Sequence, residues 1–417
     1  MIGVLRDSTY AKLFGAQVIA LLGTGLLTVA LSLLAFDIAG GQAGIVLGTA
    51  LTIKMVAYVA VSPVIAAAVA QAPRRVVLIC ADLVRAGVAL ALPFVGEAWQ
   101  IYLLIFVLQS ASATFTPAFQ AVIPDVLPRE EDYTRALSLS RLAYDLESVF
   151  SPVLAAALLT VTSYHHLFLG TVVGFLGSAL LVTLTRLPAA TPQEAAPFRQ
   201  RITLGSRALL AHRELRSLLA MNLVVAAATA MVIVNTVLLV RGHLGREQSD
   251  VALMFAAYGT GSMVTALAAP RLLERITDRQ LMLTGTATAP AGLLVGAALL
   301  AGTPHRWTWI AVCTTWFVLG AANSTVLTSS ARLIRRHTPP ARRPAAFAAQ
   351  FSLSHACFML TYPLAGALGS SAGLASAAAA LAALGMLGAV TATILWGRSR
   401  RDGRDQISAG NPSATAG

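Results

Sequence analysis

Apolar runs of helix length follow one another along the chain, separated by short polar segments. Each run holds about 20 residues or more, enough for an α-helix to cross a hydrocarbon core of roughly 30 Å. The runs lack the alternation of apolar and polar residues that strands of a barrel require. We predict spans near residues 13–36, 43–70, 75–96, 100–121, 136–160, 166–187, 216–240, 250–271, 280–302, 307–330, 345–369 and 371–396. The sequence therefore predicts an all-α membrane protein with twelve transmembrane helices.

Composition excludes a soluble globule. The 417 residues are 57% hydrophobic and 12% charged, whereas an ordinary soluble domain carries about 25% charged residues. So few charges cannot coat a surface that faces water. The lipid bilayer is therefore the first predicted partner of the chain.

The net charge of +12 is explained by where the basic residues lie. Most of the 30 Lys and Arg residues fall in the termini and in alternate loops, and the opposite loops carry only Arg241, Arg246 and Arg306. This asymmetry is the positive-inside signature, so both termini are predicted to be cytoplasmic. The abundance of Ala, and of Arg over Lys, indicates a bacterial source and hence the inner membrane. Binding to nucleic acid is not needed to explain the charge.

Two six-helix halves are indicated by a proline register. Pro128 and Pro152 are 24 residues apart, as are Pro339 and Pro363, and each of the second pair lies 211 residues after its counterpart. Duplicated six-helix units place a substrate site between the halves. We predict an N-terminal bundle over residues 1–187, a cytoplasmic linker over 188–215, a C-terminal bundle over 216–397 and a disordered cytoplasmic tail over 398–417.

The loop between the second and third predicted helices resembles that of the major facilitator superfamily. The family pattern Gly-x-Leu-x-Asp-Arg-x-Gly-Arg-Arg corresponds to residues 66–75, which end in Arg74 and Arg75, and Asp82 and Arg85 follow. The acidic position of the pattern is Ala70 here. In the family this acidic residue helps to latch the halves on the cytoplasmic side, so its replacement is expected to weaken the outward-open state.

Two further segments resemble bacterial exporters of the macrolide-efflux and enterobactin-exporter kind. Residues 115–128, from Phe115 to Pro128, match the exit of the fourth helix, and Ser151–Ala156 loosely matches the antiporter motif of the fifth. The resemblance implies the major facilitator fold, with two six-helix repeats, and transport of a small-molecule substrate by a monomer.

Ionisable residues at mid-membrane depth are the first candidates for function. Lys54 lies about 18 Å inside the second span and Asp145 about 15 Å inside the fifth, from opposite sides. Arg141 shares a helix face with Asp145, while Glu147 lies on another face. Such residues are costly in lipid and indicate function with a partner. We predict that Lys54, Arg141, Asp145 and Glu147 couple transport to protons; the alternative is a static, self-neutralising cluster.

Four residues near the cytoplasmic end of the third span suggest a gate. We predict that Arg74, Arg75, Asp82 and Arg85 form a cytoplasmic gate network. The alternative is a local salt bridge between Asp82 and Arg85.

Scattered polar and aromatic residues suggest the lining of a mostly apolar cavity. The candidates are Gln109, Phe115, Phe119, Gln120, Asn222, Asn235, Asn323 and His355. Polar residues of this kind also join helices to one another, which is the alternative. His355 and Cys357 can bind metals, but two positions along a helix put them about 200° apart, so no metal site is predicted.

These features favour a secondary active transporter, most simply a proton-coupled exporter of hydrophobic or amphiphilic small molecules. Export of a metal ion or metal chelate, uptake, and a membrane enzyme or sensor on a transporter scaffold are the alternatives. The sequence has no Gly-x-x-x-x-Gly-Lys-Ser/Thr phosphate loop, no nucleophile elbow and no His-Glu-x-x-His pair. We therefore predict neither an enzyme nor a cofactor.

Overall fold

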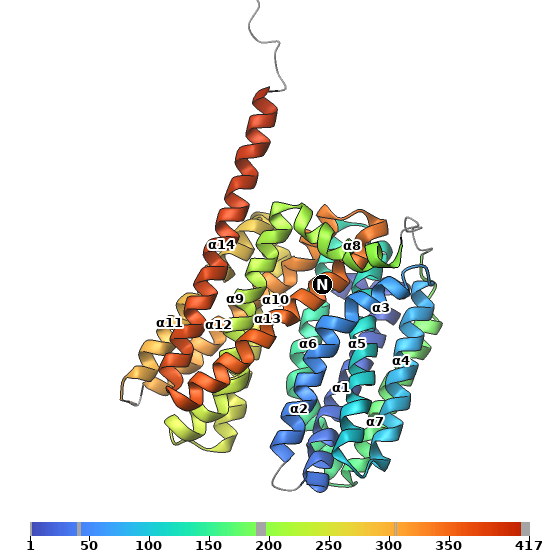
Figure 1. Ribbon diagram of the computed structural model, residues 1–417, viewed down its shortest axis with the longest axis vertical. Coiled ribbons are helices and arrows are strands. Elements are labelled where there is room, and N and C mark those ends of the chain that lie inside the picture. Colours follow the sequence, from blue (N-terminus) through green and yellow to red (C-terminus); the bar gives the residue numbers. More distant parts are fainter. Residues whose placement is uncertain (1, 40–42, 189–196, 304, 306, 410–417) are drawn as a thin grey trace, which may run out of the picture.

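The computed structural model describes residues 2–39, 43–188, 197–303, 305 and 307–409. Within these ranges the chain is helical, with no strand. Figure 1 shows two bundles side by side, the N-terminal one in blue and cyan and the C-terminal one in yellow to red. The prediction of a twelve-helix fold built from two repeats is confirmed.

The N-terminal half contains six membrane-spanning helices. A short 3-10 helix precedes them, η1 (Ile2–Arg6), and the second of the six is divided into three segments. They are α1 (Ser8–Ala39), the second helix made of α2 (Ala43–Val56), the π-helical η3 (Ala57–Val61) and α3 (Ser62–Ala68), α4 (Arg74–Ala91) with η4 (Leu92–Phe94), α5 (Ala98–Val126), α6 (Glu130–Leu159) and α7 (Tyr164–Thr183).

The C-terminal half repeats this arrangement after α8 (Phe198–Ala211), a helix within the predicted linker. Residues 189–196 of that linker lie outside the described ranges. Its helices are α9 (Arg213–Val237) with the π-helical η5 (Leu238–His243), α10 (Gln248–Arg275), α11 (Asp278–Ala301), α12 (Thr308–His337), η6 (Pro340–Arg342), α13 (Arg343–Ser371) and α14 (Leu374–Ala409). α14 continues to Ala409, beyond residue 397, where we predicted a disordered tail to begin; residues 410–417 are not among those described.

Length and hydropathy explain the membrane spans. Nine helices of the described residues are long and apolar enough to cross a membrane. The other three spans are the divided second helix, α6 and α10. α6 begins with Glu130, Glu131 and Asp132 and carries further charges along its length, which lower its mean hydropathy.

Among the described residues, the two halves share a hydrophobic core at one end of the molecule. We call the end of the molecule where α8 lies the linker end; at the opposite end the two bundles diverge (Figure 1). One core cluster combines Tyr133 and Phe119 of the N-terminal half with Leu215 and Phe347 of the C-terminal half. Two other clusters are each confined to a single half. Apolar burial therefore holds the halves together at the linker end.

Glycines allow α10 and α12 to approach each other closely. A Cβ at Gly261 would lie 1.9 Å from the carbonyl oxygen of Phe317, and one at Gly320 would lie 1.9 Å from that of Tyr258. Small residues at such crossings are typical of membrane helices. The contact fixes α10, whose Ser262 and Tyr258 take part in the interactions described below.

Candidate functional site

An ion-pair cluster at the linker end joins α4, α5 and α13. Asp125, near the end of α5, pairs with Arg74, the first residue of α4, and with Arg343, the first residue of α13. The Arg343 contact crosses between the halves, with 3.5 Å between Nη1 and Oδ1. Arg74 also donates to the carbonyl oxygen of Ala121. We call Arg74, Asp125 and Arg343 the Asp125 bridge.

A second cluster joins α6, α11 and α12. Glu130, the first residue of α6, accepts hydrogen bonds from Arg332 at 2.8 Å and from Arg336 at 2.9 Å across the halves. The same arginines hold Asp278, the first residue of α11, at 2.9 and 3.0 Å. Arg332 also donates to the hydroxyl of Thr134. We call Glu130, Asp278, Arg332 and Arg336 the Glu130 bridge.

The arginines of the Glu130 bridge act on the ionisation of Glu130. Burial raises the pKa of Glu130, but the hydrogen bond from Arg336 and the charges of Arg332 and Arg336 outweigh it and hold this pKa below its usual value. Nearby, Tyr133 is buried and donates to the carbonyl oxygen of Ala331 at 3.3 Å, again across the halves. Charge and apolar contact therefore coincide at the linker end.

The residues predicted to form a gate divide into two groups. Arg74 belongs to the Asp125 bridge, and Arg75 donates to the carbonyl oxygen of Thr183. Asp82 and Arg85 pair with each other inside the N-terminal half, where Ser178 donates to Asp82 at 2.7 Å. The Arg85 guanidinium lies between two aromatic rings, 4.3 Å from the centroid of Phe115 and 4.5 Å from that of Phe175. The Asp82–Arg85 pair thus joins α4, α5 and α7, in the manner of the local salt bridge considered above.

One predicted pair at mid-depth also connects the halves. Arg141 pairs with Asp145 at 2.7 Å along α6, and its Nε donates to the hydroxyl of Ser262 on α10 at 3.0 Å. The Asp145 side chain is 8% exposed. On the other side of the molecule, Ser352 of α13 donates to the carbonyl oxygen of Val59 in η3 at 2.5 Å. Each half therefore supplies one mid-depth hydrogen bond to the other.

Lys54 and Glu147 form a separate group next to η3. The Lys54 ammonium lies 5.5 Å from the centroid of the Tyr58 ring. Lys54 is the charged neighbour that acts electrostatically on Glu147, and it acts on His355 as well. Tyr58 donates to Gln109 at 2.9 Å and meets the ring of His355 edge to face across the halves, 4.7 Å between ring centroids. The four predicted charged residues thus form two sites, one around Asp145 and one around Glu147.

Most of the predicted cavity residues have partners in their own half. Asn222 and Gln350 exchange two hydrogen bonds at 2.9 and 3.3 Å, and Asn235 donates to the carbonyl oxygen of Ala365 at 3.2 Å. Asn323 donates to the hydroxyls of Thr229 at 2.9 Å and Tyr258 at 3.0 Å. Helix packing accounts for these three asparagines without a ligand.

The aromatic and glutamine candidates on α5 differ in exposure. Phe115 and Phe119 are buried at 5% and 4% exposure and stack on each other, 5.7 Å between centroids. Gln109 and Gln120 are half-buried. Two of the eight candidates, Gln109 and His355, contact Tyr58, whose ring lies next to the Lys54 ammonium.

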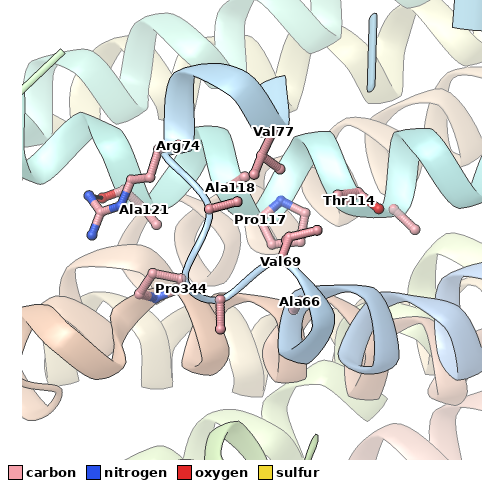
Figure 2. Close-up of a pocket in the computed structure, with 12 residues that line it drawn as sticks. Ala66, Val69, Arg74, Val77, Thr114, Pro117, Ala118, Ala121 and Pro344 are labelled. Atoms are coloured by element: carbon pink, nitrogen blue, oxygen red, sulfur yellow. Dashed lines mark hydrogen bonds between the residues drawn. The ribbon is translucent and has the colours of Figure 1, made fainter. Parts of the chain in front are cut away.

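A pocket opens beside the loop that follows α3. It is lined by Ala66, Val69, Ala70, Ala72, Arg74, Val77, Ala113, Thr114, Pro117, Ala118, Ala121 and Pro344. Figure 2 shows Pro117 and Ala118 side by side on α5, with Val69, which follows α3, next to them and the Arg74 guanidinium turned away at one side. Ala70, where the resemblance predicts an acidic residue, lines this mostly apolar space. The closure of the linker end instead uses Asp125 and Glu130.

The described residues hold no group of three or more His, Cys, Asp or Glu side chains placed to bind a metal ion. His355 Nδ1 lies 2.7 Å from the carbonyl oxygen of Phe351, and the Cys357 thiol donates to that of Leu353 at 3.5 Å. Each side chain therefore bonds to its own helix, and the two do not converge on one point.

Twelve helices in two halves, closed at one end and with charged groups between them, define a multi-pass membrane transporter rather than an enzyme. A model of the Major Facilitator Superfamily matches residues 13–245 and, a second time, residues 218–415. The chain belongs to this superfamily. The two matches cover the two halves in turn, in agreement with the predicted repeat.

Curated relatives are similar at low identity. The chain is 26% identical over 264 residues to the MFS-type transporter YfiS of Bacillus subtilis, covering 60% of each protein. It is 25% identical over 184 residues to macrolide efflux protein A of Streptococcus pyogenes, covering 43% of this chain and 45% of that protein. The chain thus matches about half the length of these relatives, and the resemblance to the macrolide-efflux branch is confirmed.

The solved structures support the fold. A bacterial homologue of the iron transporter ferroportin, in an outward-facing state, superimposes with a TM-score of 0.78 at 14% identity, over 93% of this chain and 99% of that one. At this identity the likeness concerns the arrangement of helices alone.

Proposed function

We propose that this chain exports hydrophobic or amphiphilic small molecules in exchange for protons. The observation that carries the proposal is the pair of α6 carboxylates, Asp145 and Glu147, each at mid-membrane depth and each beside a basic residue. Because an ionised carboxylate is costly in lipid, gain or loss of a proton there changes the balance of contacts between the halves. The name of the relative macrolide efflux protein A supports export of a bulky, largely apolar solute.

The orientation follows from the positive-inside asymmetry. With both termini in the cytoplasm of a bacterium, the linker end is the inner end, and closure by the two bridges corresponds to an outward-facing monomer. Protonation from outside would loosen the pair of Asp145 with Arg141 and weaken the longer-range attraction between Glu147 and Lys54. The halves would then be free to rock and to expose the site to the cytoplasm.

Transport in inverted membrane vesicles tests the proposal. An acidic lumen is imposed, and lumen pH is followed together with a panel of fluorescent amphiphiles and divalent metals. We expect an amphiphile to accumulate while the proton gradient is consumed, and Asp145→Asn and Glu147→Gln to abolish both signals. Glu131→Gln, at an exposed position in the first turn of α6, is the matched control.

Two results would contradict the proposal. Unchanged proton-driven transport in both carboxylate variants would show that Asp145 and Glu147 do not couple transport. Movement of a divalent metal alone would favour the metal-export alternative.

A further inference from the structure

Helix α8 lies across the linker end and meets both halves there (Figure 1). Gly205 of α8 packs so closely on α13 that a Cβ at this position would lie 2.0 Å from the carbonyl oxygen of Ala345. A small cavity opens between α8, α13 and the end of α3. Its lining includes Ala66, Ala67 and Ala70 in and just after α3, Arg201 of α8, and Ala345 and Ala348 of α13. The walls of this cavity therefore come from both halves.

Arg201 is the one charged side chain among the described residues that line this cavity. Its Nε is buried without a hydrogen-bond partner in the described part of the chain, and its guanidinium lies 6.0 Å from the centroid of the Phe198 ring. α8 contains no acidic residue that could pair with Arg201 from the same helix. Arg74, in contrast, already belongs to the Asp125 bridge. Because a buried donor without a partner is costly, the position of Arg201 favours an anion from outside the chain.

The mostly apolar cavity of Figure 2 adjoins this one, since Ala66 and Ala70 line both. Two of the helices around it, α3 and α4, expose the apolar side chains of Val64 and Val76 at 42% and 49%. Such exposed apolar side chains suit contact with the hydrocarbon of a membrane. A cation without an acidic partner beside an apolar cavity fits a ligand that has an anionic head and a hydrocarbon chain.

We propose that these two cavities bind an anionic phospholipid, with its phosphate on Arg201 and part of an acyl chain in the apolar cavity. Anionic headgroups attract basic residues at the cytoplasmic surface of a membrane, where the predicted orientation puts the linker end. The inference goes beyond the proposed function and does not depend on the substrate, the direction of transport or its coupling to protons.

A lipid at this place would favour the closed linker end. It would contact α3 of the N-terminal half and, through the cavity at Arg201, α13 of the C-terminal half. Separation of the halves at the linker end would move these walls apart and divide the site. Because a ligand stabilises the conformation that it binds more tightly, the lipid would add to the effect of the two bridges.

Thermal unfolding of the delipidated full-length protein in detergent tests the site without a gradient. The protein is titrated with phosphatidylglycerol, with phosphatidylcholine of the same acyl chains, and with inorganic phosphate, and Kd follows from the dependence of Tm on ligand concentration. We expect phosphatidylglycerol to bind roughly fivefold more tightly than phosphatidylcholine, the effect of one arginine at a membrane surface. Inorganic phosphate alone should not raise Tm.

Three variants separate the head of the lipid from its chain. Arg201→Gln should raise the Kd of phosphatidylglycerol to that of phosphatidylcholine. Arg207→Gln, at an exposed position of α8 outside the cavity lining, is the matched control and should keep the fivefold preference. Ala70→Leu partly fills the space where the two cavities meet, so it should raise the Kd of both lipids and leave their ratio unchanged.

Four results would overturn the lipid site. They are equal Kd values for the two lipids in native protein, a preference that survives Arg201→Gln, an equal loss of preference in Arg207→Gln, and stabilisation by inorganic phosphate that matches that by phosphatidylglycerol. The third would mean that the diffuse charge of α8 attracts the lipid, and the fourth that the ligand is a soluble anion.

The effect on closure has a readout of its own. Spin labels at Glu97 and Gly302, both exposed at the far end, report the distance between the diverging ends of the halves. Exchange of phosphatidylcholine for phosphatidylglycerol in nanodiscs should increase the population with a long distance in native protein, and Arg201→Gln should abolish this response. A response of the same size in Arg201→Gln would overturn the role of Arg201 in closure.

Discussion

The two halves close the linker end with ion pairs of opposite polarity at equivalent positions. In the N-terminal half an arginine begins α4 and an aspartate lies near the end of α5; in the C-terminal half an aspartate begins α11 and an arginine, Arg336, lies in the last turn of α12. The 211-residue register pairs Asp125 with Arg336. Asp125 of the N-terminal half pairs with Arg343 of the C-terminal half. Arg336 of the C-terminal half pairs in turn with Glu130 of the N-terminal half. Opposite charges at equivalent positions of the two repeats thus allow the linker ends of the two halves to form ion pairs with each other.

At mid-depth the register shows a different contrast. It pairs Arg141 with Ser352, Asp145 with Ala356 and Glu147 with Phe358. Both Arg141 and Ser352 bond across to the other half, so the place of contact is retained. The charges, however, are found only in the N-terminal member of each pair. Closure is therefore shared between the halves, whereas the titratable chemistry is concentrated in the first.

The largest expected effect comes from breaking the Glu130 bridge at its centre. Arg332→Met removes the contacts with Asp278, Glu130 and Thr134, and the Asp278 side chain is only 3% exposed. Because Arg336 still pairs with Asp278, we expect a loss of about 2 kcal/mol in the free energy of unfolding, below the roughly 3–5 kcal/mol for an uncompensated buried charge. Denaturant unfolding in detergent measures it, with Arg275→Met at an exposed position of the same end as control. A loss no larger than that of the control would contradict the role given to Arg332.

The two mid-depth hydrogen bonds between the halves, Arg141 to Ser262 and Ser352 to Val59, should differ in strength. Arg141→Gln removes both the Asp145 pair and the bond to Ser262, and we expect it to cost about 1.5 kcal/mol, because Ser262 still hydrogen-bonds to Asp145. Ser352→Ala removes one bond to a carbonyl oxygen and should cost about 1 kcal/mol. Unfolding of the two variants under the same conditions checks the order. Equal losses would mean that the charge asymmetry between the halves has no energetic consequence.

A smaller effect is expected from the cross-half arm of the Asp125 bridge. The Arg343–Asp125 distance is 3.5 Å, and Arg74 remains to neutralise Asp125 when Arg343 is removed. Arg343→Ala should therefore cost about 0.5 kcal/mol, because the lost contact is long and Asp125 keeps its pair with Arg74. If it instead matched Arg332→Met, the two bridges would contribute equally to closure.

The smallest effect concerns pH. The pKa of Glu130 is held below its usual value by the neighbouring arginines. A carboxyl group whose pKa is lowered on folding contributes stability above its unfolded pKa, and this contribution is lost as the pH falls through the folded pKa. Between about pH 6 and 8 the Glu130 bridge should therefore be insensitive to pH. Unfolding of native protein and of Glu130→Gln across this range measures the difference, which should stay constant; a difference that shrinks below pH 7 would contradict the assignment.

The fold was predictable because the membrane restricts the choices. Twelve apolar runs and a 211-residue proline register were enough for the helix count and the repeat. The division of the second helix at η3 was not predicted, although Pro63, in the first turn of α3 directly after η3, is a residue type that interrupts helices. Yet Tyr58 and the carbonyl oxygen of Val59, both in this turn, contact α13.

The gate was harder to predict than the buried charges. Lys54, Arg141, Asp145 and Glu147 were identified because charge is rare at mid-depth. Asp125, Glu130, Asp278 and Arg343 were missed because charged residues at cytoplasmic helix ends are common and only the folded arrangement selects their partners. A signal was present in the acidic first turns of α6 and α11 and in the cluster of arginines from Arg332 to Arg343.

The distance between the diverging ends of the halves tests the central claim, that oppositely charged bridges hold the linker end closed. Spin labels at Glu97 and Gly302, both exposed at the far end, are introduced in a background free of the three cysteines. Native protein in nanodiscs should give a long distance, and Glu130→Arg, which faces Arg332 and Arg336, should shift the population to a shorter one. Adding Arg336→Glu should restore most of the long distance. A distribution that does not change with Glu130→Arg would show that the bridges do not control closure.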